Sequence, residues 1–117
     1  PFIQDVLLQE DGGGETTLRV VVDDGAMANA IDTAAYEAAK QTLGELAWSP
    51  RVLRMANGDL VPSRGAWSGE VVFGGAWRRG RFEVFPSDGT WAALFGKPLL
   101  ESFAAWHGYE EDVIVLR

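Results

Sequence analysis

Short apolar runs alternate with glycines and polar turn residues along most of this chain. The strongest run is residues 16–22, which ends in Val20-Val21-Val22, a β-branched pattern typical of a strand buried on both faces. Residues 2–8 form a weaker run, and a glycine-rich flexible turn separates it from residues 16–22. The pattern predicts two opening strands.

A hairpin is predicted at Asn57-Gly58, between residues 51–56 and 59–61. Asn and Gly both tolerate positive φ, and together they are the strongest two-residue hairpin signal. The expected product is an exposed loop projecting from two short strands.

A second hairpin is predicted to pair residues 70–73 with residues 76–85. In the second of these strands Phe82 and Val84 alternate with charged neighbours, among them Glu83. This alternation indicates a half-buried strand whose charged side chains face solvent.

Two short helices are also expected. Residues 34–43 are rich in Ala, Glu, Lys and Gln, Asp32-Thr33 can cap the start, and Gly44 stands where the helix would stop. Residues 98–106 have helical apolar spacing with a proline near the first turn. Further short strands are expected at residues 91–95 and 113–116.

Composition narrows the class of protein. The 117 residues fit one domain, covering 1–117, and 47% apolar against 23% charged residues is the balance of a folded globular chain. A net charge of −7 disfavours binding to nucleic acid or to an anionic membrane, and no apolar run is long enough to span a bilayer. The absence of cysteine fits a reducing compartment, so we expect an intracellular, cytoplasmic protein. Because the chain starts at Pro1, it can be a fragment of a longer one.

The segment Val21-Val22-Asp23-Asp24-Gly25-Ala26 resembles the active-site loop of retropepsins, in which an apolar strand ends in Asp-Ser/Thr-Gly-Ala. Residues 94–100 resemble the second signature of that family, two apolar residues and a glycine before a short helix. The hairpin of residues 54–58 stands between them, where the family has its flap. The likeness covers about residues 16–117 and is greatest to the protease segment of gypsy-like retrotransposon polyproteins.

The resemblance implies a mainly β, closed-barrel fold and a homodimer. It also implies an aspartic protease that processes a polyprotein, inside retroelement particles where such particles form. Such an enzyme needs no metal or other cofactor. Each chain would contribute Asp23 as its catalytic residue. The remaining implied site residues are, for the active-site loop, Asp24, Gly25 and Ala26; for the flap, Met55, Ala56, Asn57 and Gly58; and for structural support near the site, Asn29, Leu94, Phe95 and Gly96.

A physical argument for Asp23 stands beside the resemblance. An acid at the end of a buried apolar strand, followed by a glycine that permits a sharp bend, can be held rigidly at the floor of a cleft. Hydrolysis by paired carboxylates needs two acids in contact, and a two-fold dimer of this chain would bring two buried copies of Asp23 face to face.

Asp24 departs from the family pattern, because a Ser or Thr hydroxyl usually stands there and an ionised carboxylate can only accept hydrogen bonds. This departure puts the activity in question and favours one alternative, a catalytically silent dimerisation module with the same fold. Another alternative makes Asp24 the catalyst, although this shifts Gly25 and Ala26 out of register.

Other candidate sites are weaker. A metal site built from Asp23, Asp24 and His107 is disfavoured because the histidine is distant in sequence and follows an apolar helix, where surface or cap positions are common. Large aromatic residues in a small domain usually belong to the core, so Trp67, Trp77 and Trp91 are expected there before they are expected in substrate pockets.

Overall fold

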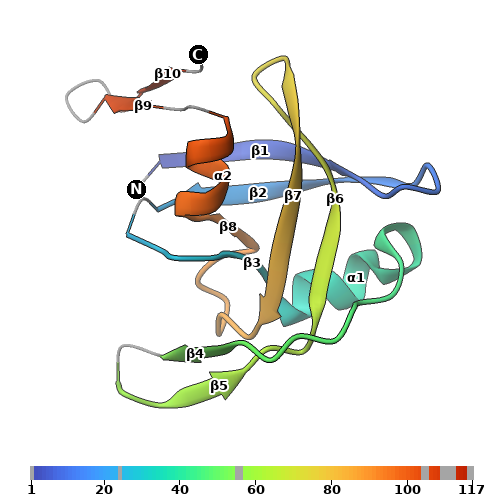
Figure 1. The fold of residues 1–117 in the computed structure, drawn as a ribbon, viewed down its shortest axis with the longest axis vertical. Helices are drawn as coiled ribbons and strands as arrows, with labels where there is room; N and C mark the ends of the chain where they lie inside the picture. The colour runs from blue at the N-terminus through green and yellow to red at the C-terminus, as the bar shows by residue number, and fades with distance from the viewer. Residues whose placement is uncertain (1, 24, 55–56, 104–105, 109–112, 116–117) are drawn as a thin grey trace.

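In a computed structural model, residues 2–23, 25–54, 57–103, 106–108 and 113–115 are described. Six strands form a closed barrel in the order β1-β2-β8-β3-β7-β6 (Figure 1). These strands are β1 (Phe2–Gln9), β2 (Glu15–Val22), β3 (Asn29–Asp32), β6 (Ala66–Phe73), β7 (Ala76–Phe85) and β8 (Ala93–Phe95). Two helices, α1 (Thr33–Leu43) and α2 (Lys97–Ser102), and two separate hairpins, β4 (Val52–Arg54) with β5 (Leu60–Pro62) and β9 (Trp106–Gly108) with β10 (Val113–Val115), complete the description.

The barrel combines antiparallel hairpins with parallel pairings. β1 pairs with β2 along its full length, β6 pairs with β7, and β1 closes the barrel against β6. β8 inserts between β2 and β3, parallel to the first and antiparallel to the second, and β3 runs parallel to β7. The end of β2, the start of β3 and the start of α2 therefore meet at one end of the barrel, where Asp23 bonds to Phe95, Ala26 to Lys97 and Asn29 to Gly96.

The apolar positions of the barrel strands pack into one core. Val20, Ile31, Phe82 and Phe95 are each almost completely buried there. The Phe95 ring stacks on Phe103, with ring centroids 6.2 Å apart, so the core extends under the end of α2. Aromatic burial of this kind is among the largest contributions to the stability of a small domain.

Helix α1 has the boundaries that the sequence predicts. The Asp32 side chain accepts a hydrogen bond from the Ala35 amide at 3.1 Å, and Gly44 ends the helix with a φ of 84°. The Tyr36 hydroxyl donates to the Gly44 carbonyl at 2.6 Å, which fixes the turn that follows. Since Asp32 is also the last residue of β3, the strand passes directly into the helix.

Both predicted hairpins are confirmed, but β6 begins at Ala66, four residues before the predicted start at residue 70. Strand β3 was not predicted, since its four residues carry no periodic signal and it depends on pairing with β7 and β8. The predicted helix over residues 98–106 is wrong at its end: α2 stops at Ser102, and Trp106–Gly108 forms β9 by pairing with β10.

The tryptophans divide between core and surface. Trp67 is buried, as predicted, and its indole N–H donates to the Leu43 carbonyl at 2.9 Å. Trp77 is 60% exposed on β7, so the expectation of a core position is wrong for it, because alternate side chains of β7 near the hairpin tip face solvent. Trp91 is partly exposed. Neither helix of the described residues is long and apolar enough to cross a membrane.

Candidate functional site

Asp23 stands at the point where β2 leaves the barrel. Its amide donates to the Phe95 carbonyl at 2.9 Å, which continues the β2–β8 pairing by one residue. Its carbonyl accepts from Ala26 at 3.1 Å, and its carboxylate oxygen Oδ1 accepts from the Gly25 amide at 2.9 Å. The main chain thus holds this acid in one position while a tight turn follows it.

The Asp23 side chain is exposed in the single chain, so the expectation of a buried acid is wrong for one chain alone. The cause is its position beyond the last buried residue of β2, Val22, at the open end of the barrel. A solvent-accessible carboxylate can accept a proton from water, but alone it offers no second acid to protonate a leaving or developing oxygen.

The junction of β8 and α2 supports the turn after Asp23. The Lys97 amide donates to the Ala26 carbonyl at 2.8 Å, and Leu94 and Phe95 pair with the end of β2. A side chain at Gly96 would collide with the carbonyl oxygens of Ala26 and Ala28. The close approach of two main-chain segments requires glycine here, and the sequence signature around Gly96 reflects this packing.

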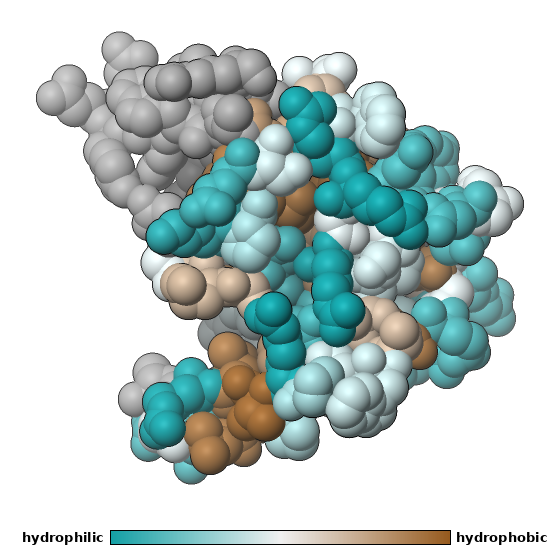
Figure 2. Space-filling model, in the orientation of Figure 1, coloured by the Kyte–Doolittle hydropathy of each residue, from teal (hydrophilic) through white to brown (hydrophobic). Residues whose placement is uncertain are grey.

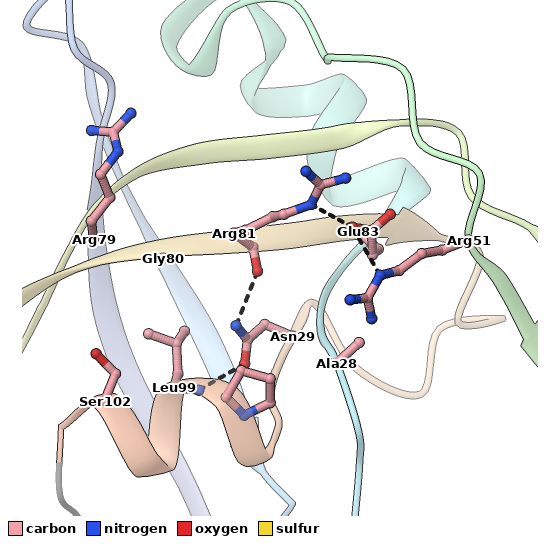
Figure 3. Close-up of a pocket in the computed structure, with 10 residues that line it drawn as sticks. Ala28, Asn29, Arg51, Arg79, Gly80, Arg81, Glu83, Leu99 and Ser102 are labelled. Atoms are coloured by element: carbon pink, nitrogen blue, oxygen red, sulfur yellow. Dashed lines mark hydrogen bonds and ion pairs between the residues drawn. The ribbon is translucent and has the colours of Figure 1, made fainter.

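Asn29 connects three elements around the site. It is only 3% exposed. Its side-chain amide donates to the Arg81 carbonyl on β7 at 3.0 Å, and its oxygen accepts from the Leu99 amide at 3.4 Å (Figure 3). The same oxygen also accepts from the Gly96 amide at 3.0 Å. Buried polar groups of this kind are costly when unpaired, so a fully bonded Asn29 fixes β3, β7 and α2 in one arrangement.

The β4–β5 hairpin projects from the barrel on the side of the molecule where the turn after Asp23 also lies (Figure 1). At its tip Asn57 accepts the Asp59 amide at 2.9 Å, and Gly58 adopts a φ of 91°. In the space-filling view the hairpin forms a separate lobe with apolar surface (Figure 2), to which Val52 and Leu60 contribute as exposed side chains. Met55, Ala56 and Asp24 lie outside the described residues.

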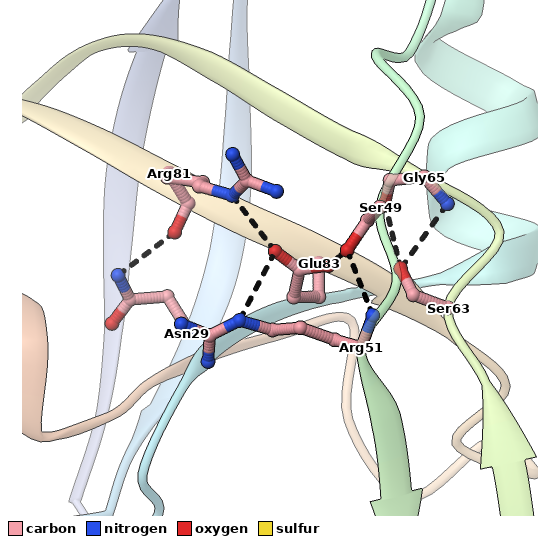
Figure 4. Close-up of polar contacts among 7 residues, drawn as sticks. All are labelled: Asn29, Ser49, Arg51, Ser63, Gly65, Arg81 and Glu83. Carbon is pink, nitrogen blue, oxygen red and sulfur yellow. Dashed lines mark hydrogen bonds and ion pairs between the residues drawn. The ribbon is translucent and has the colours of Figure 1, made fainter.

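Glu83 at the base of this hairpin was expected in solvent but is 2% exposed. The Ser49 hydroxyl donates to one of its carboxylate oxygens, Arg81 Nε donates to the other at 2.9 Å, and Arg51 Nε lies 3.9 Å from that second oxygen (Figure 4). Burial alone would raise the pKa of the Glu83 carboxyl, but these hydrogen bonds and the Arg81 charge together hold the pKa below its usual value.

Sequence reasoning missed Glu83 because alternation on a strand normally puts a charged residue in solvent. One signal was present: its neighbours Phe82, Val84 and Phe85 are all apolar, and all are buried. A charged side chain inside such a run can be buried only if it has hydrogen-bond partners. Here the partners are Ser49, which is distant in sequence, and Arg81, which lies two residues before Glu83.

Next to this cluster, a pocket of about 210 Å³ opens between α2 and β7 (Figure 3). Its lining residues come from β3 and the turn before it, from the segment leading into β4, from β7 and from α2; they are Ala28, Asn29, Arg51, Arg79, Gly80, Arg81, Glu83, Pro98, Leu99 and Ser102. Three arginines and one glutamate make this pocket locally basic on a protein of net charge −7.

Among the described residues, no group of three or more His, Cys, Asp and Glu side chains is placed to hold a metal ion. Asp24 of the alternative metal site lies outside those residues, and His107 lies on β9 opposite Ile114 of β10. Within the described part of the chain, the site therefore presents the exposed carboxylate of Asp23, a rigid turn after it, and a hairpin on the same side.

No family model and no curated protein matches the chain. Solved structures do, and all three described next are under 25% identical. The retroviral protease-like domain of Ddi1 from Leishmania major is 15% identical with a TM-score of 0.61, covering 97% of this chain and 83% of its own. A retropepsin-like aspartic protease from Rickettsia conorii is 20% identical with a TM-score of 0.62, covering 97% and 90%. EIAV protease in complex with the inhibitor HBY-793 is 20% identical with a TM-score of 0.67, covering 87% and 86%. The closed barrel with its two helices is therefore a retropepsin-like fold.

Proposed function

We propose that this protein is an aspartic endopeptidase that acts as a homodimer, in which Asp23 of each chain forms the catalytic pair. The observation that supports this most is the position of Asp23 in a retropepsin-like fold, at the end of β2, where its amide donates to the Phe95 carbonyl and its carboxylate accepts from the Gly25 amide. Each chain supplies one such acid, and a two-fold axis is the simplest way to supply the second.

The proposed chemistry follows from the pairing. Two carboxylates about 3 Å apart cannot both ionise readily, so the pair holds one proton and titrates as a unit. The ionised Asp23 accepts a proton from a water molecule as the water attacks the scissile carbonyl carbon, and the protonated copy donates to the carbonyl oxygen. The reaction needs no cofactor.

The β4–β5 hairpin is proposed to act as a flap. Its tip, residues 55–58, would cover the bound peptide, exclude water and offer main-chain hydrogen bonds to an extended substrate. The exposed apolar side chains of Val52 and Leu60, 55% and 60% accessible, support a hairpin that meets another polypeptide.

For the substrate of this endopeptidase, we propose a polyprotein of a gypsy-like retroelement, processed inside the cell. It rests on the sequence resemblance of residues 54–62, 82–85 and 95–100 to that group.

The second candidate function is a catalytically silent dimerisation module, which Asp24 favours. Two copies of an ionised carboxylate near the dimer axis would repel each other where hydroxyl groups usually join the two loops. An Asp24→Thr variant tests this second candidate. If the unchanged chain cleaves no peptide and the Asp24 charge alone silences the site, the variant should gain cleavage.

The test is cleavage of a pool of unfolded polypeptides followed by mass spectrometry, at pH 4 to 8. We expect cleavage that is best in mildly acidic buffer, is blocked by a pepstatin-like inhibitor, and is lost in the isosteric variant Asp23→Asn. Glu37→Gln, which changes an exposed acid on α1, is the matched control for the loss of one charge. Activity that survives Asp23→Asn, or that rises steadily into the alkaline range, would contradict the proposal.

A further inference from the structure

The pocket between α2 and β7 carries an inference about substrate choice, and it rests on the proposed peptidase function. We propose that this pocket binds the carboxylate of an acidic side chain of the substrate peptide, through Arg51 and Arg81. The sequence resemblance assigns no role to either residue.

The first argument is the balance of donors and acceptors. Glu83 is the acid that lines the pocket, and both of its oxygens already accept hydrogen bonds, from Ser49 and from Arg81 Nε. The ion-pair contact of Arg51 with Glu83 is through Nε at 3.9 Å, which is longer than a hydrogen bond. Among the residues that the structure describes, the terminal nitrogens of Arg51 and Arg81 therefore have no acceptor.

The third arginine of the pocket differs from these two. Both terminal nitrogens of Arg79 bind the carboxylate of Asp11 in the β1–β2 turn, at 2.8 and 2.9 Å. Its charge is thus already matched outside the pocket. Arg51 and Arg81 carry the surplus positive charge, and their side chains are 56% and 50% exposed, so a ligand can reach them.

The second argument is the shape of the donor group. A guanidinium presents parallel N–H groups that match the two oxygens of a carboxylate, and the pair is stronger than a neutral hydrogen bond. The rest of the surface repels acidic peptides, because the net charge is −7. One acidic residue at this pocket would therefore be recognised, whereas a peptide acidic along its whole length would not.

The third argument is the position of the pocket relative to Asp23. Ala28, which lines one edge of it, follows Asp23 by five residues, so this edge is at most about 18 Å from Asp23. Arg51 precedes β4 at the base of the hairpin that is proposed to cover the peptide. An extended peptide advances about 3.3 Å per residue, so the recognised side chain lies within five residues of the cleaved bond.

The experiment measures kcat/KM for a cleaved peptide in which each of the five positions on either side of the bond carries Glu or Gln in turn. We expect a preference for Glu of about 5-fold at one position, since half-exposed ion pairs contribute little more. In Arg51→Gln this preference should fall to below 2-fold. Arg64→Gln, which removes the same charge from an exposed residue outside the pocket, should retain it.

Two further arms separate a failed pocket from a failed enzyme or a failed fold. In Asp23→Asn, binding of fluorescein-labelled Glu and Gln peptides should show the same preference without cleavage, and 1 M NaCl should reduce it. Cleavage with a Glu-to-Gln ratio near one at every position, or an unchanged ratio in a folded Arg51→Gln, overturns the inference but not the peptidase. If the unchanged chain binds the Glu peptide preferentially but cleaves no peptide, only the peptidase proposal is overturned.

Discussion

The residue that does most to assemble the site is Asn29, which is not itself charged or exposed. Asp23 depends on the turn at residues 25–28, and that turn is held because Asn29 joins β3 to β7 and to the start of α2. The buried side-chain amide of Asn29 thus helps to fix the carboxylate of Asp23, six residues earlier in the sequence.

Replacing Asn29 by Ala should lower the free energy of unfolding by about 2–4 kcal/mol, because it removes the buried bond to the Gly96 amide and the partly buried bond to the Arg81 carbonyl. Urea unfolding followed by tryptophan fluorescence gives the value. Gln41→Ala, the truncation of an exposed amide on α1, should change it by no more than about 0.5 kcal/mol. Equal effects of the two changes would mean that the Asn29 bonds contribute little.

At the scale of elements, the β4–β5 hairpin is attached to the barrel by a buried charge cluster as well as by its strands. Glu83 on β7 binds Ser49 before the hairpin, and Ser63 after the hairpin donates to the Gly65 carbonyl at 2.9 Å (Figure 4). An ionised Glu83 therefore fixes the segment that leads into β4, and the Ser63 bond separately fixes the turn after β5. The hairpin can therefore be held at a defined angle although its own strands have three residues each.

This attachment predicts a pH dependence of stability. The folded-state pKa of Glu83 lies below its ordinary value of 4.5, so its stabilising contribution is complete above pH 4.5 and is lost as pH falls through the folded-state pKa. Glu83→Gln should therefore lower the free energy of unfolding at pH 7 and reduce its fall between pH 5 and pH 3, as measured by urea unfolding.

The control for this prediction is Glu37→Gln, at an exposed position on α1, which should change the free energy of unfolding at pH 7 by no more than about 0.5 kcal/mol. Asp32 contributes in the same pH range, because the hydrogen bonds it accepts from Ser87 and Ala35 outweigh the effect of burial and lower its pKa. Some acid dependence should therefore remain in Glu83→Gln. An undiminished fall between pH 5 and pH 3 would contradict the role assigned to Glu83.

At the scale of the whole molecule, the proposed enzyme is incomplete as a single chain, since one exposed carboxylate cannot serve as both acid and base. Specific activity should therefore fall on dilution, in parallel with dissociation of a dimer measured by light scattering.

Two linked tandems of the chain are the controls. The unchanged tandem should keep its activity on dilution, whereas a tandem with one Asp23 changed to Asn should be inactive. Constant specific activity of the unlinked chain, together with a strictly monomeric mass, would contradict the proposed dimer.

The sequence by itself determined the elements whose signals are local. The valines of β2 and the capping of α1 by Asp32 depend on neighbours within a few residues, and both appear as expected. The hairpin around Asn57-Gly58 also forms, but Arg54 pairs with Leu60, so five residues separate the paired strands where the sequence predicted two. The glycine at position 96 was also readable, because a sequence signature reports the close approach that it permits.

Only the tertiary structure decided the rest, because the deciding contacts join residues far apart in sequence. β3 exists through its pairing with β7 and β8, and Glu83 is buried through a bond to Ser49, 34 residues away. Asn29 bonds to Gly96 across 67 residues. No local pattern encodes which buried polar group meets which partner. The sequence could therefore predict that Asp23 lies at the end of a strand, but not the hydrogen bonds that hold it there or the basic pocket.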